Sequence, residues 1–205
     1  RFSYRVSFPE ILLKIMTWGD KKESVQKELD QAEKLIRQEL GVKIYAVGDE
    51  TIEKVVGRLL KKQKATLALA ESCTGGFITH MLTNVSGSSA YVSQGCVVYS
   101  NNAKQDLLGV SGELIKEHGA VSSQVAKEMA VGIRRRAQTT YGLAVTGIAG
   151  PTGATKEKPL GVVHVAIATP TEVKEKEYCF PAPRELFKIA VANVALHKLR
   201  RVLLK

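Results

Sequence analysis

Cysteine, tryptophan and long apolar runs are scarce in this chain. Three cysteines and one tryptophan occur among 205 residues, and aromatic residues make up 6%. A small, odd number of cysteines argues against a disulfide framework and is typical of proteins in a reducing cytoplasm. No apolar run approaches the roughly 18 residues that a membrane-spanning helix needs, so we expect no membrane association.

The N-terminus and the histidines also lack familiar patterns. The chain begins Arg-Phe-Ser-Tyr-Arg, without an initiator Met and without the apolar core of a signal peptide. We therefore expect a fragment of a longer cytoplasmic protein, or a processed chain. The four histidines are scattered, and none pairs with another His or with a Cys at the spacing of metal ligands. We expect no metal and no other cofactor.

Short catalytic motifs are missing as well. Neither the Walker loop Gly-x-x-x-x-Gly-Lys-Ser/Thr nor the dinucleotide fingerprint Gly-x-Gly-x-x-Gly occurs. Around Ser72, Ala70 and Thr74 occupy the glycine positions of Gly-x-Ser-x-Gly, and Gly75 stands where Ser-x-x-Lys needs its lysine. These absences exclude the kinase, hydrolase and lactamase assignments that rest on such motifs.

Charge is the clearest bias in the composition, with a net value of +10. A basic protein can bind nucleic acid, and a basic cleft can attract a phosphate-bearing metabolite. A solvated, lysine-rich surface explains the same number. The run Arg134–Arg136, near the end of an expected helix, complements the helix dipole without any ligand. We do not expect a nucleic-acid partner.

One stretch organises the rest of the chain. The apolar run over residues 66–70 ends at Glu71-Ser72-Cys73-Thr74-Gly75-Gly76, and a helical pattern follows over residues 77–82. A strand, a tight turn and a helix would leave backbone N–H groups free to bind an oxyanion or a phosphate. Ser72 would lie at that turn as an exposed nucleophile. A plain helix N-cap is the alternative, since Ser and Thr are preferred at that position.

The expected elements indicate two parts. Residues 1–48 contain extended segments, an amphipathic helix over residues 21–40 and a strand over 42–47, which together form a small α+β module. Asp49 is expected to cap a helix over residues 51–62, and we place the domain boundary at this cap. Further helices are expected over residues 77–82, 101–108, 113–118, 123–138 and 184–203, and strands over 66–70, 91–99, 143–145, 162–168 and 173–180. Because the last two strands follow each other directly, we predict an α/β fold: a three-layer sandwich with a mixed sheet.

Tyr99 and Lys104 are the first candidate partners for Ser72. Tyr99 ends an expected strand, and Lys104 lies in the first turn of the helix that follows. A lysine near the positive end of a helix has its pKa lowered, more so when it is buried, and can act as a general base. A neighbouring phenol can relay the proton. Taken singly, Tyr99 is more simply explained as an aromatic residue at the rim of the site, and Lys104 as a cation on the surface.

A second glycine-rich loop, residues 146–153, follows the strand over 143–145 just as the Ser72 turn follows its strand. Two such loops at the ends of core strands would form one cleft.

Cys73 is an alternative nucleophile. Adjacent side chains in a turn point in different directions, however, so we expect Cys73 to be a small residue of the core. Arg184, at the start of the last helix, would clamp a phosphate or lie on the surface. Glu71 would orient Lys104 or a backbone N–H, or face solvent.

These motifs resemble, in order and spacing, the C-terminal domain of the competence/damage-inducible protein CinA, a family that includes nicotinamide-nucleotide amidases. The resemblance covers residues from about 49 to the C-terminus, and residues 1–48 look like part of the KH-type connector of longer members. The matching segments are Ala70-Glu71-Ser72-Cys73-Thr74-Gly75-Gly76, Tyr99-Ser100-Asn101, Lys104, Gly119-Ala120-Val121-Ser122 and Thr146-Gly147-Ile148-Ala149-Gly150-Pro151.

The resemblance implies hydrolysis of the carboxamide of nicotinamide mononucleotide, which yields nicotinate mononucleotide and ammonia. It implies Ser72 as nucleophile, Tyr99 and Lys104 as its activating partners, and Thr146 and Arg184 as positions tied to activity. It implies no metal. The residues expected to line the substrate site are Glu71, Thr74, Gly75, Gly76, Gly147, Gly150 and Arg184.

One feature departs from the connector. RNA binding by a KH domain uses a Gly-x-x-Gly loop, but Gly19-Asp20-Lys21-Lys22 lacks the second glycine. We interpret residues 1–48 as a spacer or a dimer contact, and expect a homodimer. A catalytically inactive partner-binding module of a competence or DNA-damage protein stays open as the alternative function.

Overall fold

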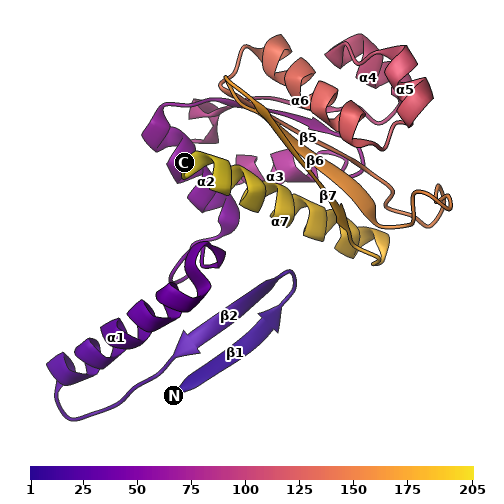
Figure 1. The fold of residues 1–205 in the computed structure, drawn as a ribbon. Helices are drawn as coiled ribbons and strands as arrows, with labels where there is room; N and C mark the ends of the chain where they lie inside the picture. Colours follow the sequence, from indigo (N-terminus) through magenta and orange to yellow (C-terminus); the bar gives the residue numbers. More distant parts are fainter. The chain divides into compact units, whose positions relative to one another are not determined.

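The computed structural model describes residues 1–205, which fall into two compact units, Arg1–Glu50 and Thr51–Lys205. The first unit contains a hairpin of strands β1 (Phe2–Ser7) and β2 (Glu10–Ile15), followed by helix α1 (Lys22–Leu40) and the short 3₁₀ helix η1 (Gly41–Lys43). The second unit holds the remaining elements, arranged around one sheet (Figure 1).

The hairpin of the first unit is amphipathic. Phe2, Tyr4 and Val6 pair across it with Ile15, Leu13 and Ile11, and cross-strand partners share one face of a sheet. The strand expected over residues 42–47 is wrong. The chain turns there through η1, and the two hairpin strands pair only with each other, so residues 42–47 have no ladder to join.

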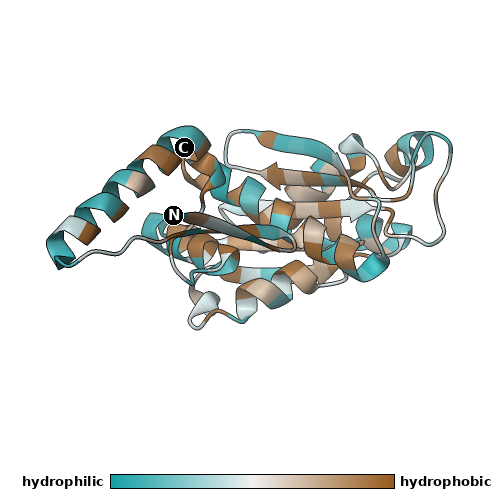
Figure 2. Cartoon of the chain, turned by 90° about the horizontal axis from the view of Figure 1, so that it is seen from below, coloured by the Kyte–Doolittle hydropathy of each residue, from teal (hydrophilic) through white to brown (hydrophobic).

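The sheet of the second unit has five strands in the order β4-β3-β5-β6-β7. Strand β3 (Leu67–Glu71) runs parallel to β4 (Val92–Val97) and β5 (Tyr141–Gly147), whereas β6 (Val162–Ala168) and β7 (Val173–Cys179) continue it as antiparallel strands. The mixed sheet predicted from the sequence is therefore confirmed. Figure 2 shows hydrophobic residues along the inner strands of this sheet, whereas β7 at its edge carries four charged residues in a row, Lys174–Glu177.

Helices cover both faces of the sheet, which makes three layers (Figure 1). One face carries α4 (Asn101–Leu108), α5 (Gly112–His118) and α6 (Ser123–Ala137), and the other carries α2 (Ile52–Gln63), α3 (Phe77–Thr83) and α7 (Arg184–Leu203). The short 3₁₀ helix η2 (Ser88–Ala90) precedes β4. No helix combines the length and the apolar composition that crossing a bilayer requires.

Small residues let α6 approach the sheet closely. Ala68, Ala70, Ala144 and Ala166 are buried on the face that α6 covers. A Cβ atom on Gly142 would lie 2.2 Å from the carbonyl oxygen of Ala130 in α6, which is too close for any side chain. Alternation along β3 places the residue after the strand, Ser72, on the face of Ala68 and Ala70.

Side-chain caps fix the starts of the helices next to this edge of the sheet. The hydroxyl of Ser100 accepts the N–H of Ala103 at the start of α4, and the hydroxyl of Ser122 accepts that of Val125 in α6. The cap of α4 is therefore Ser100, the residue directly before Asn101. At the start of α2 the N-cap residue is Thr51 and not Asp49, because the helix begins at Ile52.

Candidate active site

The candidate site lies where neighbouring chain connections leave the sheet on opposite sides. After β3 the chain turns into α3 on one face, and after β4 it turns into α4 on the other. Because β3 and β4 are parallel neighbours, their carboxyl ends lie at the same edge of the sheet, between these two connections. Ser72 follows β3, while Tyr99 and Lys104 follow β4, so both sets of residues reach the same edge.

The structure brings Ser72 and Lys104 together. The Nζ atom of Lys104 lies 3.2 Å from the Oγ atom of Ser72, and the lysine side chain is 1% exposed. The same amine donates hydrogen bonds to the backbone carbonyls of Val98 at 3.0 Å and Tyr99 at 3.4 Å. Ser72 itself is 8% exposed, and its backbone N–H continues the sheet by donating to the carbonyl of Val145. The serine is held from both sides.

Burial lowers the pKa of Lys104, because removing the side chain from water penalises the ammonium form. No carboxylate accepts a hydrogen bond from its amine; its acceptors are the Ser72 hydroxyl and two carbonyls. An amine with a lowered pKa and a hydroxyl in contact form the pair that base-activated nucleophilic chemistry requires.

Cys73, the residue after Ser72, also has a side chain that can act as a nucleophile, but its burial keeps the thiol unreactive. The side chain is buried, and burial raises the pKa of its thiol to about 12, with a smaller raising effect of the Glu71 charge. A thiol that stays protonated is a poor nucleophile. The structure therefore places Cys73 in the core, as the sequence suggested, and leaves Ser72 as the candidate nucleophile at this turn. The expectation that Ser72 is exposed is wrong: its side chain is buried between the turn and Lys104.

Tyr99 is placed differently from expectation. Its side chain is 59% exposed, and its hydroxyl accepts a hydrogen bond from Nη2 of Arg184 at 2.7 Å. Arg184 Nη1 donates to the carbonyl of Gly150 at 2.8 Å, so the guanidinium joins the β4 end to the second glycine loop. The contact between Tyr99 and Lys104 uses the backbone carbonyl of Tyr99, not its phenol.

Glu71 and Thr74 lie inside the turn and do not line its surface. Glu71 is 1% exposed, and its carboxylate accepts hydrogen bonds from the Thr74 hydroxyl, the Ile78 N–H and both the N–H and the hydroxyl of Thr79. These contacts cap the start of α3. The buried carboxylate stabilises the helix because it accepts hydrogen bonds from N–H groups that have no partner within the helix. The expectation that Glu71 and Thr74 bind substrate is therefore corrected: their oxygens are committed to shaping the turn.

Gly75 and Gly76 permit that shape. Both have positive φ values, 62° and 92°, which side chains rarely tolerate. The N–H of Gly75 donates back to the carbonyl of Ser72 at 3.1 Å, which closes the turn. The N–H groups of Cys73 and Thr74 donate no hydrogen bond to another residue of the chain. They are the donors available beside the serine.

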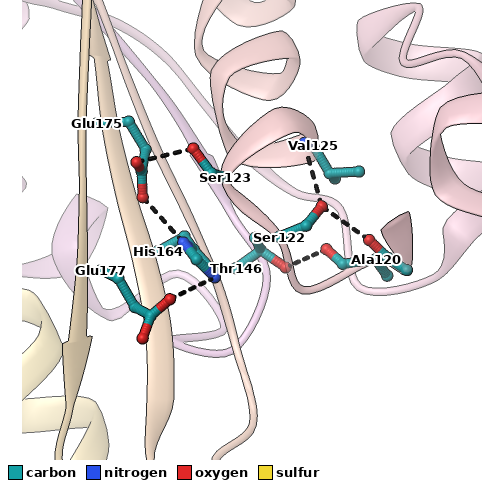
Figure 3. Close-up of polar contacts among 9 residues, drawn as sticks. Ala120, Ser122, Ser123, Val125, Thr146, His164, Glu175 and Glu177 are labelled. Atoms are coloured by element: carbon teal, nitrogen blue, oxygen red, sulfur yellow. Dashed lines mark hydrogen bonds and ion pairs between the residues drawn. The ribbon is translucent and has the colours of Figure 1, made fainter. Parts of the chain in front are cut away.

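Thr146, the residue before the last of β5, lies next to Ser72, and its hydroxyl donates to the carbonyl of Ala120 at 2.8 Å, just before α6 (Figure 3). Thr146 is buried. Gly147 pairs with Val163, and a Cβ there would lie 2.7 Å from the carbonyl oxygen of Val162, so only glycine fits this close approach. The hydroxyl of Thr146 thus ties the second glycine loop to the start of α6.

A separate cleft of about 350 Å³ lies beyond Thr146, against the first turn of α6. His164, opposite Thr146 in β6, lines it, with Nδ1 2.8 Å from Glu175 and Nε2 3.6 Å from Glu177 (Figure 3). The Ser123 hydroxyl donates to the other oxygen of Glu175. Ser72 does not line this cleft.

Sequence reasoning missed several contributors to the site. The carbonyl of Val98 that holds Lys104 is a backbone atom and leaves no trace in residue type. Lys188 lies beside Gly75. Its spacing of four residues from Arg184 could have indicated that the two side chains lie on the same side of a helix.

No group of three or more His, Cys, Asp or Glu side chains is placed to hold a metal ion.

The motifs and this geometry agree with the comparisons to known proteins. The CinA C-terminal domain family matches residues 49–203. The chain belongs to this family. A CinA-like protein of Desulfosudis oleivorans is 45% identical over 205 residues, which are 100% of this chain and 50% of that protein. A CinA-like protein of Geotalea daltonii is 46% identical over 202 residues, 98% of this chain and 49% of that protein.

Solved CinA-superfamily structures share the fold. The competence/damage inducible protein CihA from Agrobacterium tumefaciens is 38% identical with a TM-score of 0.71, and the match covers 78% of this chain and 99% of that one. A CinA-superfamily protein from Escherichia coli is 28% identical with a TM-score of 0.70, covering 81% of this chain and 98% of that one. The chain spans about half the length of the curated CinA-like relatives it matches.

Proposed function

We propose that this chain is an amidohydrolase that converts nicotinamide mononucleotide to nicotinate mononucleotide and ammonia, with Ser72 as nucleophile and Lys104 as its base. The observation that carries the proposal is the 3.2 Å contact between Lys104 Nζ and Ser72 Oγ, made by a buried lysine. Membership of the CinA family and the resemblance described above supply the substrate.

The hydrogen bonds of Lys104 favour its role as a base. A neutral amine has two N–H groups and one lone pair. In the structure the amine donates to the Ser72 hydroxyl and to the carbonyls of Val98 and Tyr99. Once the amine has lost a proton, its two remaining N–H groups can stay on the carbonyls, and its lone pair then faces the Ser72 hydroxyl. Burial lowers the pKa of Lys104, so the amine is neutral at a lower pH than that of a solvated lysine.

The chemistry then proceeds in two halves. Lys104 takes the Ser72 proton while Oγ attacks the carboxamide carbon, and the N–H groups of Cys73 and Thr74 hold the oxyanion, a contribution of about 3 kcal/mol per donor. The C–N bond breaks as the Lys104 ammonium returns its proton to the leaving nitrogen, which departs as ammonia. Water, deprotonated by Lys104, attacks the acyl ester; the carboxylate product leaves and Ser72 regains its proton.

The test is ammonia release from nicotinamide mononucleotide by the wild-type chain and by Ser72→Ala. We expect turnover by the wild type and only the background rate for the variant, with Ser93→Ala, a serine within β4, as a matched control that keeps activity. Equal background rates for the wild type and Ser72→Ala would end the enzyme proposal and favour the non-catalytic partner-binding module.

A further inference from the structure

The sheet of the second unit has two edges, and they differ in charge. Strand β7 at one edge carries four charged residues in a row, Lys174–Glu177. Strand β4 at the other edge carries no charged residue and no proline. Charged side chains on an edge strand hinder its pairing with a strand of another molecule, and proline hinders it too. The β4 edge has neither form of protection.

The uncharged surface extends beyond β4 itself. No Asp, Glu, Lys, Arg or His occurs in residues 81–103, although charged residues make up 24% of the chain. This stretch comprises the end of α3, the 3₁₀ helix η2, β4 and the start of α4. Val97 is 50% exposed, and Tyr99 is exposed as well. An uncharged, partly apolar edge in a charge-rich protein is typical of a surface that another protein chain covers.

The open backbone groups of β4 lie at Gly95 and Val97. In a parallel pair, alternate residues direct their N–H and C=O groups to the neighbouring strand. The N–H of Val98 donates to β3, so alternation directs Gly95 and Val97 away from β3, towards the open edge. A bulge interrupts the alternation on the N-terminal side of Gly95. Because Gly95 has no side chain, its exposure to solvent is exposure of its backbone.

A second copy of this chain suits the β4 edge better than an acidic partner does. The chain has a net charge of +10, so two copies repel each other and approach with least repulsion at an uncharged edge. A partner of opposite charge would instead be met by lysines and arginines. Two copies of one strand can also pair about a two-fold axis, in which case each copy forms the same contacts as the other.

We propose that the chain forms a homodimer through β4, which pairs antiparallel with β4 of a second copy and joins the two sheets into one. The open residues fix the register: Gly95 of each copy pairs with Val97 of the other, and Cys96 lies at the two-fold axis. A shifted register would place one open residue opposite the bulge or beyond the end of the strand. The interface adjoins the Ser72 site, because β4 leads to the carbonyls that hold Lys104. The proposal does not depend on the proposed reaction.

The side chains along this pair allow close contact. Val97 of one copy and Gly95 of the other share one face of the joined sheet. The two Val97 side chains are then diagonal neighbours, about 7–8 Å apart and within the reach of long side chains. Helix α3 covers Gly95 on that face, since a Cβ there would lie 2.6 Å from Thr79, but it leaves the edge of the strand open. No like charges meet across the axis.

The experiment places charges of both signs at one position of the full chain. Sedimentation equilibrium measures the mass of the wild type, of Val97→Glu, of Val97→Lys and of an equimolar mixture of the two variants. Val131→Glu, the same change at an exposed valine of α6, is the matched control. Hydrogen exchange of the wild type at low and high concentration follows the N–H groups of Gly95 and Val97 and needs no substitution. Thermal unfolding checks the fold of each variant.

We expect the wild type to sediment at twice the 22.3 kDa of one chain, and both N–H groups to exchange more slowly as the concentration rises. Val97→Glu and Val97→Lys each weaken the dimer by at least about tenfold, because each buries an unpaired charge at the contact. The mixture recovers the dimer, since opposite charges then meet across the axis, and Val131→Glu stays dimeric.

A monomeric wild type would leave the β4 edge to a different partner and overturn the proposal. Exchange of the Gly95 and Val97 N–H groups that does not depend on concentration would overturn it as well. A dimer that both Val97 variants retain would place the interface elsewhere. Disruption by both variants that mixing does not repair would reject the antiparallel pairing about Cys96.

Discussion

The amine of Lys104 lies 3.2 Å from the hydroxyl of Ser72, although 32 residues separate them in the chain. Two parallel strands and the start of α4 produce this contact. Ser72 extends β3, and Lys104 reaches back from α4 under the carbonyls that end β4. The pair is buried, so its protonation state is set by the protein interior more than by solvent.

The rate of ammonia release should therefore rise with pH through the pKa of Lys104. That pKa is lowered by burial, so the neutral, active amine is reached below the pH at which a solvated lysine deprotonates. The measurement is kcat/KM for nicotinamide mononucleotide between pH 6 and pH 10 (about four units, the range that separates these cases). A rate that falls across this range would contradict a lysine base; Lys104→Met should leave only the background rate at every pH.

Tyr99→Phe should change substrate binding more than proton transfer. The phenol contacts Arg184, whereas the interaction with Lys104 uses the backbone carbonyl, which phenylalanine keeps. We expect KM to rise a few-fold, about the effect of one lost hydrogen bond, with kcat and its pH profile little changed. Loss of kcat comparable to that of Ser72→Ala would instead assign the phenol to proton transfer.

Glu71→Gln should destabilise the turn. The carboxylate accepts four hydrogen bonds in the interior, and an amide would present two N–H groups to donors. We expect the free energy of unfolding to fall by about 2–4 kcal/mol, measured by urea denaturation. Glu185→Gln, on the exposed first turn of α7, is the control for loss of a carboxylate, and a similar effect of the two changes would refute the capping role.

Cys73 should be chemically silent. Burial raises the pKa of its thiol to about 12, whereas Cys179 is exposed. Iodoacetamide at pH 8 (about the pKa of a free thiol) should alkylate Cys179 and leave Cys73 unmodified, as peptide mass mapping would show. Cys73→Ala should keep ammonia release; its loss, together with alkylation of Cys73 in the folded protein, would favour the thiol as nucleophile.

His197 should make stability depend on pH. Burial first, and then the charges of Arg200 and Arg201, lower its pKa from 6.5 to about 4. The unfolded chain therefore binds a proton between these values that the folded chain does not, so stability is complete above about pH 6.5 and is lost as the pH falls towards 4. The slope is at most about 1.4 kcal/mol per pH unit. Urea denaturation at several pH values should show a flatter curve for His197→Gln; identical curves would contradict the assignment.

The sequence by itself determined most elements of the second unit. Alternating and helical patterns placed β3, β6, β7 and α7, because each reflects which side of a local element faces the core. Residue types also singled out Ser72 and Lys104. The strand expected over residues 42–47 failed because a strand needs a neighbour with which to pair, and local pattern does not supply one.

Only the tertiary structure decided which side chains meet. The order of strands β4-β3-β5 and the exit of α3 and α4 to opposite faces bring Lys104 to Ser72. The same arrangement turns the Tyr99 phenol to Arg184 and buries Glu71 as a helix cap. Contacts between residues far apart in the chain depend on how strands pair and helices cross, and a period of two or 3.6 residues carries no information about either.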